Sequence, residues 1–130
     1  MALFQWNSSF SVNNTDIDNQ HKKLVTLINE LHDAMGHGKS KEVLSGIFSE
    51  LVSYTKYHFK FEEDQLEKHK YPNLAVHKLE HKKLTDQAIK LKQDFDAGKA
   101  VISIELLNFL KDWLKSHILE SDKKYVTYIN

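Results

Sequence analysis

The chain of 130 residues carries equal numbers of basic and acidic side chains, 18 of each, together with eight histidines and no cysteine. Its length suits one domain that buries a core without cross-links, and the lack of cysteine excludes disulfide bonds and thiolate metal sites. The balanced charge gives no electrostatic reason to expect a nucleic acid or an anionic membrane as a partner.

The N-terminal segment has neither the basic start nor the apolar run of a signal peptide. No stretch of the chain approaches the roughly 18–20 apolar residues that a membrane span requires. We therefore expect a single domain over residues 1–130, without a membrane span and located in the cytoplasm.

Residues 1–16 show no helical period but contain three aromatic side chains, and we expect them to form an arm laid over the rest of the domain. Asp18 has a side-chain oxygen suited to a helix N-cap and precedes the first segment with helical spacing, roughly residues 18–36. Gly36 and Gly38 close this segment. Its seam positions, at steps of three and four, are His21, Leu24, Ile28, Leu31 and Met35.

Two longer segments with the same spacing follow. The second segment covers roughly residues 41–65 behind a suitable N-cap, Ser40. The third covers roughly 73–97, opened by Pro72 and ended by Gly98, which are favoured residues at those two positions. The seam of the second is Leu44, Ile47, Leu51, Tyr54, His58 and Phe61. The seam of the third is Leu74, His77, His81, Leu84, Ala88, Leu91 and Phe95.

The fourth segment, roughly residues 104–120, begins after Ser103 and has Leu106, Leu110, Trp113 and His117 on its seam. Residues 123–130 are expected to extend the last helix or to turn back onto the bundle. Short connections favour antiparallel neighbours. The sequence therefore predicts an all-α fold, an antiparallel up-down-up-down four-helix bundle over residues 17–122 with an N-terminal arm.

Five histidines and two carboxylates fall into four short clusters on these seams. In an antiparallel bundle the starts of odd helices and the ends of even helices lie at the same end, so all seven side chains are expected in one layer of the core. Burying them there without a metal would be very costly. The seven residues are His21, His58, Glu62, His77, His81, His117 and Asp122.

The spacing within the clusters supports metal ligation at two ions. His58 and Glu62, and likewise a second pair in the third segment, are i,i+4 neighbours on one helix face. His117 and Asp122 are i,i+5, which an ideal helix rotates by roughly 140°, so we expect a π-bulge or a fraying last turn between them. Two octahedral ions offer about twelve positions. Five imidazoles, two bridging carboxylates and a bridging oxo or hydroxo group leave about one position open for a small ligand.

The other three histidines are expected outside the site. His37 and His69 lie in loops and should be solvated, and His32 is off the seam of its helix. The residues alone do not decide between iron and manganese. Zinc is the simplest alternative for clustered histidines, but a structural zinc ion takes about four ligands, and seven ligands on four helices fit two ions better.

The pattern His, His-x3-Glu, His-x3-His, His-x4-Asp resembles the hemerythrin family. The surrounding residues Asp18-Asn-Gln-His21-Lys-Lys-Leu and Trp113-Leu-Lys-Ser-His117-Ile are similar to its single-domain bacterial members, the bacteriohemerythrins. The resemblance implies a non-heme di-iron centre, Fe2+ or Fe3+ with an oxo or hydroxo bridge, that binds O2. It further implies one iron on His77, His81 and His117, the other on His21 and His58, bridges from Glu62 and Asp122, and an O2 pocket lined by Leu114.

The function implied is reversible O2 binding for storage, transport or delivery, by a protein that is not an enzyme and has no catalytic residue. The alternatives are a di-iron enzyme (a peroxidase, an oxidase or a nitric oxide reductase) and an oxygen or redox sensor module. Ferritin-like di-iron proteins carry more carboxylates and a Glu-x-x-His motif, and this chain contains no such motif. The expected partner is O2, with an oxygen-consuming enzyme as a candidate recipient, and the expected state is a monomer.

Overall fold

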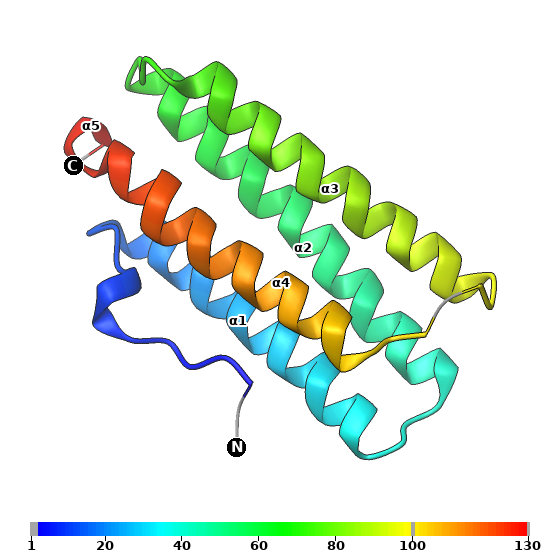
Figure 1. Ribbon diagram of the computed structural model, residues 1–130. Helices are drawn as coiled ribbons and strands as arrows, with labels where there is room; N and C mark the ends of the chain where they lie inside the picture. The colour runs from blue at the N-terminus through cyan, green and yellow to red at the C-terminus, as the bar shows by residue number, and fades with distance from the viewer. Residues whose placement is uncertain (1–2, 100, 130) are drawn as a thin grey trace.

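Four long helices lie side by side and alternate in direction in the computed structural model (Figure 1). They are α1 (Thr15–Gly36), α2 (Lys41–Lys68), α3 (Leu74–Asp96) and α4 (Ile104–Ser116). The structure describes residues 3–99 and 101–129, and these contain no strand. Residues 1 and 2 of the predicted arm and residue 130 of the predicted extension lie outside the described residues. The prediction of an all-α antiparallel four-helix bundle is confirmed.

Two of the three predicted N-cap residues cap their helices, and the third does not. Ser40 and Ser103 accept hydrogen bonds from backbone N–H groups in the first turns of α2 and α4, so both predicted N-caps are confirmed. The prediction of Asp18 as an N-cap is wrong, because α1 begins earlier, behind Asn14. The Asp18 carboxylate instead accepts from Ser11 Oγ at 2.5 Å and from the Val12 amide at 2.9 Å, and so attaches the arm to α1.

The first three helices end with the same backbone motif. In each, two N–H groups beyond the helix return to carbonyls of its last turn, which requires one residue with a left-handed backbone. That residue is Gly38 after α1, Lys70 after α2 and Gly98 after α3, with φ of 63°, 55° and 76°. The return bonds run from Gly38 and Lys39 to Met35 and Ala34, from Lys70 and Tyr71 to Glu67 and Leu66, and from Gly98 and Lys99 to Phe95 and Asp94. Gly38 and Gly98 therefore act as the sequence predicts, whereas Lys70 takes a place that glycine usually fills.

The fourth helix changes its winding before it ends. A π-helical turn, His117–Ser121, follows α4 directly and leads into a 3-10 turn, Asp122–Tyr125. The chain then closes with the short helix α5 (Val126–Ile129). The predicted irregularity between His117 and Asp122 is confirmed as a π turn, and the Asp122 side chain is fully buried.

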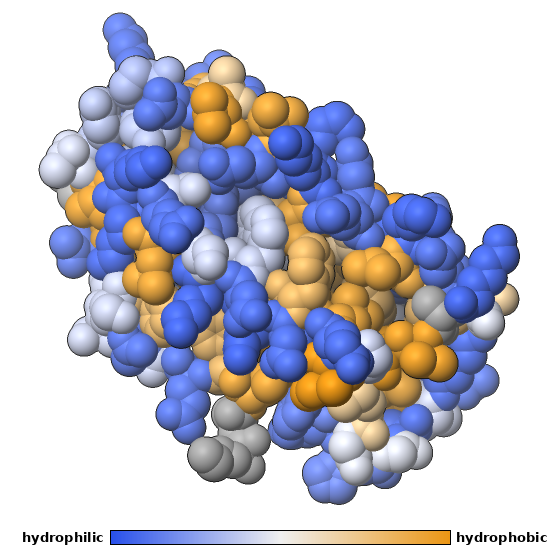
Figure 2. All heavy atoms as spheres, viewed as in Figure 1, coloured by the Kyte–Doolittle hydropathy of each residue, from blue (hydrophilic) through white to orange (hydrophobic). Residues whose placement is uncertain are grey.

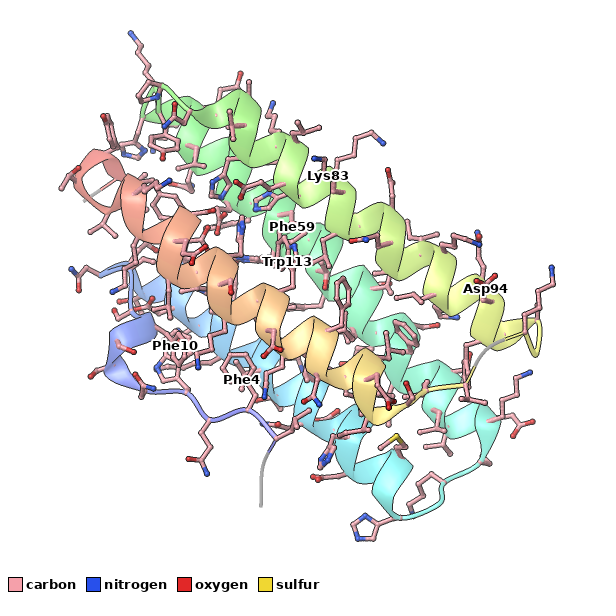
Figure 3. The ribbon with its side chains drawn as sticks, viewed as in Figure 1. Phe4, Phe10, Phe59, Lys83, Asp94 and Trp113 are labelled. Atoms are coloured by element: carbon pink, nitrogen blue, oxygen red, sulfur yellow. The ribbon has the colours of Figure 1, made fainter. Side chains whose placement is uncertain are left out.

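Two apolar clusters lie on either side of the layer that holds the predicted ligands. The larger fills the middle of the bundle and is covered by the arm, whose Phe4 and Phe10 lie against α1 (Figure 3). Asn29 of α1 holds the arm by exchanging two hydrogen bonds with the backbone of Phe4, at 2.8 and 2.9 Å. The smaller cluster closes the end of the bundle and consists of Val12, Ile17, Leu66, Tyr71, Tyr125 and Ile129.

Exposed apolar side chains gather near the end of α3 and the start of α4 (Figure 2). Leu91, Val101, Leu106 and Phe109 line a shallow groove there. This groove is at the opposite end of the bundle from the predicted ligands. No helix in residues 3–99 and 101–129 is long and apolar enough to cross a membrane.

Candidate metal centre

The fold brings all seven predicted ligands into one buried layer. The helices α1, α2 and α3 contribute five ligands at the ends that the antiparallel topology predicts, and the π turn after α4 and the residue that follows it contribute the last two. None of the seven is more than 6% exposed. Their positions are His21 in α1, His58 and Glu62 in α2, His77 and His81 in α3, His117 in the π turn and Asp122 directly after it.

The ligand atoms form two groups that share a carboxylate. Within each group, one donor atom per residue lies within 4.8 Å of every other. The larger group is Glu62, His77, His81, His117 and Asp122, and the smaller is His21, His58 and Glu62. Three imidazoles therefore surround one position and two surround the other.

Glu62 faces both groups, with one carboxylate oxygen toward each. Its Oε1 lies 2.5 Å from His77 Nε2 and 3.2 Å from His81 Nε2. Its Oε2 lies 3.2 Å from His58 Nε2 and 3.6 Å from His21 Nε2. A carboxylate arranged in this way can bridge two ions.

Asp122 is divided between the groups in the same manner. Its Oδ1 lies 3.0 Å from His77 Nε2 and 3.1 Å from His117 Nε2. Its Oδ2 lies 3.2 Å from His21 Nε2. The π turn makes this possible, because it brings a side chain five residues after His117 back to the same side of the helix.

The donor atoms themselves fit metal ions better than they fit one another. Both oxygens of Asp122 and both ring nitrogens of His21 are buried without a hydrogen-bond partner, which is a costly arrangement. The Nε2 atoms of His81 and His117 meet at 3.0 Å. Two neighbouring ligands on an octahedral ion, each bonded at about 2.1 Å, are about 3.0 Å apart. The spacing of the donors therefore suits bound ions.

The two carboxylates in the layer are a second reason to expect bound cations. Burial alone would raise the pKa values of Glu62 and Asp122, but the surrounding imidazoles outweigh it and hold both pKa values below their usual range. Burial lowers the pKa of His58. It acts likewise on His21 and His77, but the two carboxylates outweigh it and raise their pKa values to about 9 and about 10. Two ionised carboxylates thus require positive charge, from protons on imidazoles or from metal ions.

Three polar side chains that sequence reasoning missed hold the outer nitrogens of the histidines. Each faces the Nδ1 of a histidine on the next helical segment, so that Nε2 faces the centre. Gln20 and Glu63 accept hydrogen bonds from Nδ1, and Glu80 forms an ion pair. The pairs are Gln20 Oε1 with His58 at 2.7 Å, Glu63 Oε2 with His81 at 2.8 Å, and Glu80 Oε2 with His117 at 3.0 Å. Each acceptor stands beside a ligand in the sequence, but only the packing of the helices shows which histidine it meets.

Tyr125 is a fourth residue that the sequence did not indicate. Its hydroxyl donates to Glu62 Oε2 at 3.1 Å. Burial, reinforced by the nearby carboxylates, raises the pKa of Tyr125 well above its usual range, so the phenol keeps its proton. This donor fixes the oxygen of Glu62 that faces the two-histidine group.

Aromatic rings pack against two of the histidines, and apolar side chains lie next to these rings. His81 stacks on Phe59 at 3.8 Å between ring centroids, and His117 stacks on Trp113 at 4.5 Å. Phe59 and Trp113 themselves meet between α2 and α4 (Figure 3). Leu114 is buried next to them and lines a cavity of about 30 Å³.

That cavity lies about one helical turn from the ligand layer, and none of the seven predicted ligands lines it. Leu24, one turn after His21, and Thr55, one turn before His58, line it. So do Leu84, one turn after His81, and Leu114, one turn before His117. The Thr55 hydroxyl donates to the Leu51 carbonyl at 2.7 Å in its own helix. The volume exceeds the roughly 10–15 Å³ that a water-sized molecule needs, so a small molecule fits in this cavity.

The remaining histidines lie apart from this layer. His37 and His69 are exposed in the loops after α1 and α2, as predicted, and their Nδ1 atoms contact the Asp33 and Gln65 carbonyls at 2.7 and 2.9 Å. His32 is partly exposed and belongs to neither ligand group.

Comparisons with known proteins agree on one family. The family model described as hemerythrin HHE cation binding domain matches residues 13–129. The bacteriohemerythrin of Methylococcus capsulatus is 36% identical over 126 residues, which cover 96% of this chain and 95% of that protein. The bacteriohemerythrin of Clostridium acetobutylicum is 34% identical over 131 residues, with 95% and 99% covered.

Solved structures agree with these sequences. A wild-type hemerythrin crystal structure superposes with a TM-score of 0.94 at 34% identity, covering 98% of each chain. An L114A mutant of a hemerythrin gives a TM-score of 0.95, also at 34% identity, covering 99% of this chain and 98% of that one.

Proposed function

The chain belongs to the hemerythrin family, and from that premise we propose that it binds O2 reversibly at a centre of two iron ions, for oxygen storage, transport or delivery. One iron would be held by His77, His81 and His117, and the other by His21 and His58. Glu62 and Asp122 would bridge them, together with an oxo or hydroxo group. When bound, the two irons supply the electrons that O2 takes up on binding and returns on release.

The observation that carries this proposal is the unequal division of the donors. Three imidazoles and two carboxylate oxygens face one position, whereas two imidazoles and two carboxylate oxygens can face the other. With one bridging group added to each, about six places are filled at the first position and about five at the second. The second position therefore keeps room for one small ligand.

The surroundings of that position favour binding over further reaction. The cavity one turn from the ligand layer is lined by apolar side chains such as Leu24 and Leu114, which exclude water. The one hydroxyl among its lining residues, on Thr55, already donates to Leu51. Cleavage of the O–O bond calls for a positioned acid, and none of the lining residues has an acidic or basic side chain. This supports a carrier over an oxidase or a peroxidase.

An absorption spectrum tests the proposal. The reduced, iron-loaded protein is expected to change its spectrum in air, to bind one O2 per two irons, and to return to its first spectrum under vacuum. The same protein loaded with Zn2+ should not respond, because zinc has no redox chemistry. Continuous consumption of O2, peroxide or nitric oxide would point to an enzyme instead, and oxidation without any reversible phase would end the carrier proposal.

A further inference from the structure

We propose that the two metal positions differ in affinity, so that the three-histidine position fills first and the O2-binding position fills only when more metal is available. This inference rests on the two-metal site of the proposed function and adds its regulation by metal supply. A protein with one iron would hold it at the three-histidine position and would lack the iron that carries the open ligand position. The amount of O2 bound would then depend on how many molecules hold the second iron.

The first argument is the charge of the groups behind the histidines. In the three-histidine group, His81 donates from Nδ1 to the Glu63 carboxylate at 2.8 Å, and His117 Nδ1 lies 3.0 Å from the Glu80 carboxylate as an ion pair. An anionic acceptor makes the imidazole a stronger ligand, and loss of such an acceptor typically lowers metal affinity by about 10–100-fold. Hydrogen bonds to an ionised group are also roughly twice as strong as neutral ones.

The two-histidine group lacks this support. His58 donates to the neutral amide oxygen of Gln20 at 2.7 Å, and His21 Nδ1 is buried without a hydrogen-bond partner. Its neighbours are aromatic: the rings of Trp6 and His58 lie 6.4 and 4.6 Å away between centroids. On its outer side the His21 ring is therefore held by packing, part of it from the arm, and by no hydrogen-bond acceptor at Nδ1.

Burial explains why the two groups use different acceptors. The Glu63 and Glu80 side chains are 21% and 38% exposed, so water solvates part of each charge and an ionised acceptor costs little there. Ser121 Oγ also donates to Glu80 at 2.8 Å and fixes its position. Gln20 is only 7% exposed, and a carboxylate in its place would be more costly before metal binds. The neutral acceptor, Gln20, thus lies on the more deeply buried side of the site.

Repulsion between the ions adds to the difference without deciding the order. Two divalent ions that share Glu62 and Asp122 repel each other, so whichever binds second binds more weakly. The order is decided by the number of histidines and by the charge of the groups behind them. Both features favour the group of His77, His81 and His117.

Zinc titration of the metal-free, full-length protein tests the order directly. With 15N-labelled histidines, the imidazole nitrogen signals of His77, His81 and His117 are expected to shift with the first equivalent of Zn2+. Those of His21 and His58 should shift with the second. Competition with a chromophoric chelator should give dissociation constants at least tenfold apart. Simultaneous shifts of all five residues, or earlier shifts of His21 and His58, would overturn the inference.

Three variants identify the cause, each followed by the same competition assay. Glu80→Gln should weaken the first binding step about tenfold, since it removes an anionic acceptor. Gln20→Glu should strengthen the second step by a similar factor, and Gln20→Ala should weaken it. The control is Glu67→Gln, which makes the same chemical change at an exposed position of α2 and should alter neither step.

If Glu80→Gln and both Gln20 variants leave the two constants unchanged, the outer acceptors do not set the affinities and the inference fails. Zinc does not bind O2, so this result is independent of the spectral test of the proposed function. Either proposal can therefore fail while the other stands.

Discussion

At the scale of the residue, Tyr125 shows how a side chain outside the ligand set fixes the position of a ligand. The hydroxyl of Tyr125 holds one oxygen of Glu62 at 3.1 Å, and its ring lies 5.7 Å from that of His77. Tyr125 also belongs to the apolar cluster that closes the bundle end. The tail of the chain is thereby tied to the metal layer through one residue.

Leu114 offers the sharpest residue-scale prediction. Leu114→Ala should enlarge the cavity next to the ligand layer and speed O2 release and autoxidation, because solvent then reaches the site. Removing a buried leucine side chain should also cost about 2–5 kcal/mol of unfolding free energy. Stopped-flow absorption measures the rates, and urea unfolding measures the stability.

A second leucine of α4 separates these two effects. Leu107 is also fully buried in the core but does not line the cavity. Leu107→Ala should lose a similar amount of stability and leave the O2 rates unchanged. If Leu107→Ala changed the rates as much as Leu114→Ala, the effect would come from general loosening and Leu114 would have no special role.

The ligands were predictable from the sequence, but the residues behind them were not. Steps of three and four residues placed His21 and His58 on helix seams, and antiparallel topology brought the seams together. The contact from Gln20 to His58 depends on how α1 and α2 are rotated against each other, which no local pattern encodes. Asp18 was misplaced for a related reason, since a carboxylate that suits an N-cap can equally bind a neighbouring loop.

At the scale of the element, the loop between α2 and α3 carries backbone strain close to the site. Lys70 adopts a φ of 55°, a conformation that costs a residue with a side chain about 1–2 kcal/mol. Lys70→Gly removes this cost but gives the unfolded chain more freedom, worth about 0.4–1 kcal/mol. The net expectation is a gain of about 0.5–1 kcal/mol in unfolding free energy, visible as a higher urea midpoint with an unchanged slope.

Gly98 provides the reverse substitution at the equivalent place after α3. Its φ is 76°, and a Cβ added there would meet nothing within 4 Å. Gly98→Ala should therefore lose stability through backbone strain alone. A loss of stability in Lys70→Gly would show that the lysine side chain contributes more than the strain costs.

At the scale of the whole molecule, we expect the free energy of unfolding to depend on pH differently with and without bound metal. In the metal-free protein the native pKa values of His21 and His77, about 9 and about 10, lie above their ordinary value of 6.5. Their stabilising contribution is thus complete below pH 6.5 and is lost as the pH rises through 9 and 10. Glu62 and Asp122 have lowered pKa values, so their contribution is present above about pH 4–5 and is lost in acid.

Removal of the metal should reveal this dependence. After chelation, the free energy of unfolding should fall by several kcal/mol between pH 6.5 and pH 10. Metal-loaded protein should show no such fall, because bound imidazoles carry no proton at Nε2 and higher pH favours ligation. Urea unfolding of both forms across this range measures the difference. Parallel curves for the two forms would mean that His21 and His77 do not hold protons in the metal-free layer.

The π turn also changes the sequence spacing between two of the ligands. His58 and Glu62 are four residues apart in the sequence, and the distance between their closest donor atoms is 3.2 Å. His117 and Asp122 are five residues apart, yet the corresponding distance is 3.1 Å. One extra residue in the chain is absorbed by one wider turn, so the two pairs are equivalent in space. A search motif that demands the same gap on every helix would pass over this centre, whereas one that lets a single residue be inserted or deleted near the end of the last helix would find it.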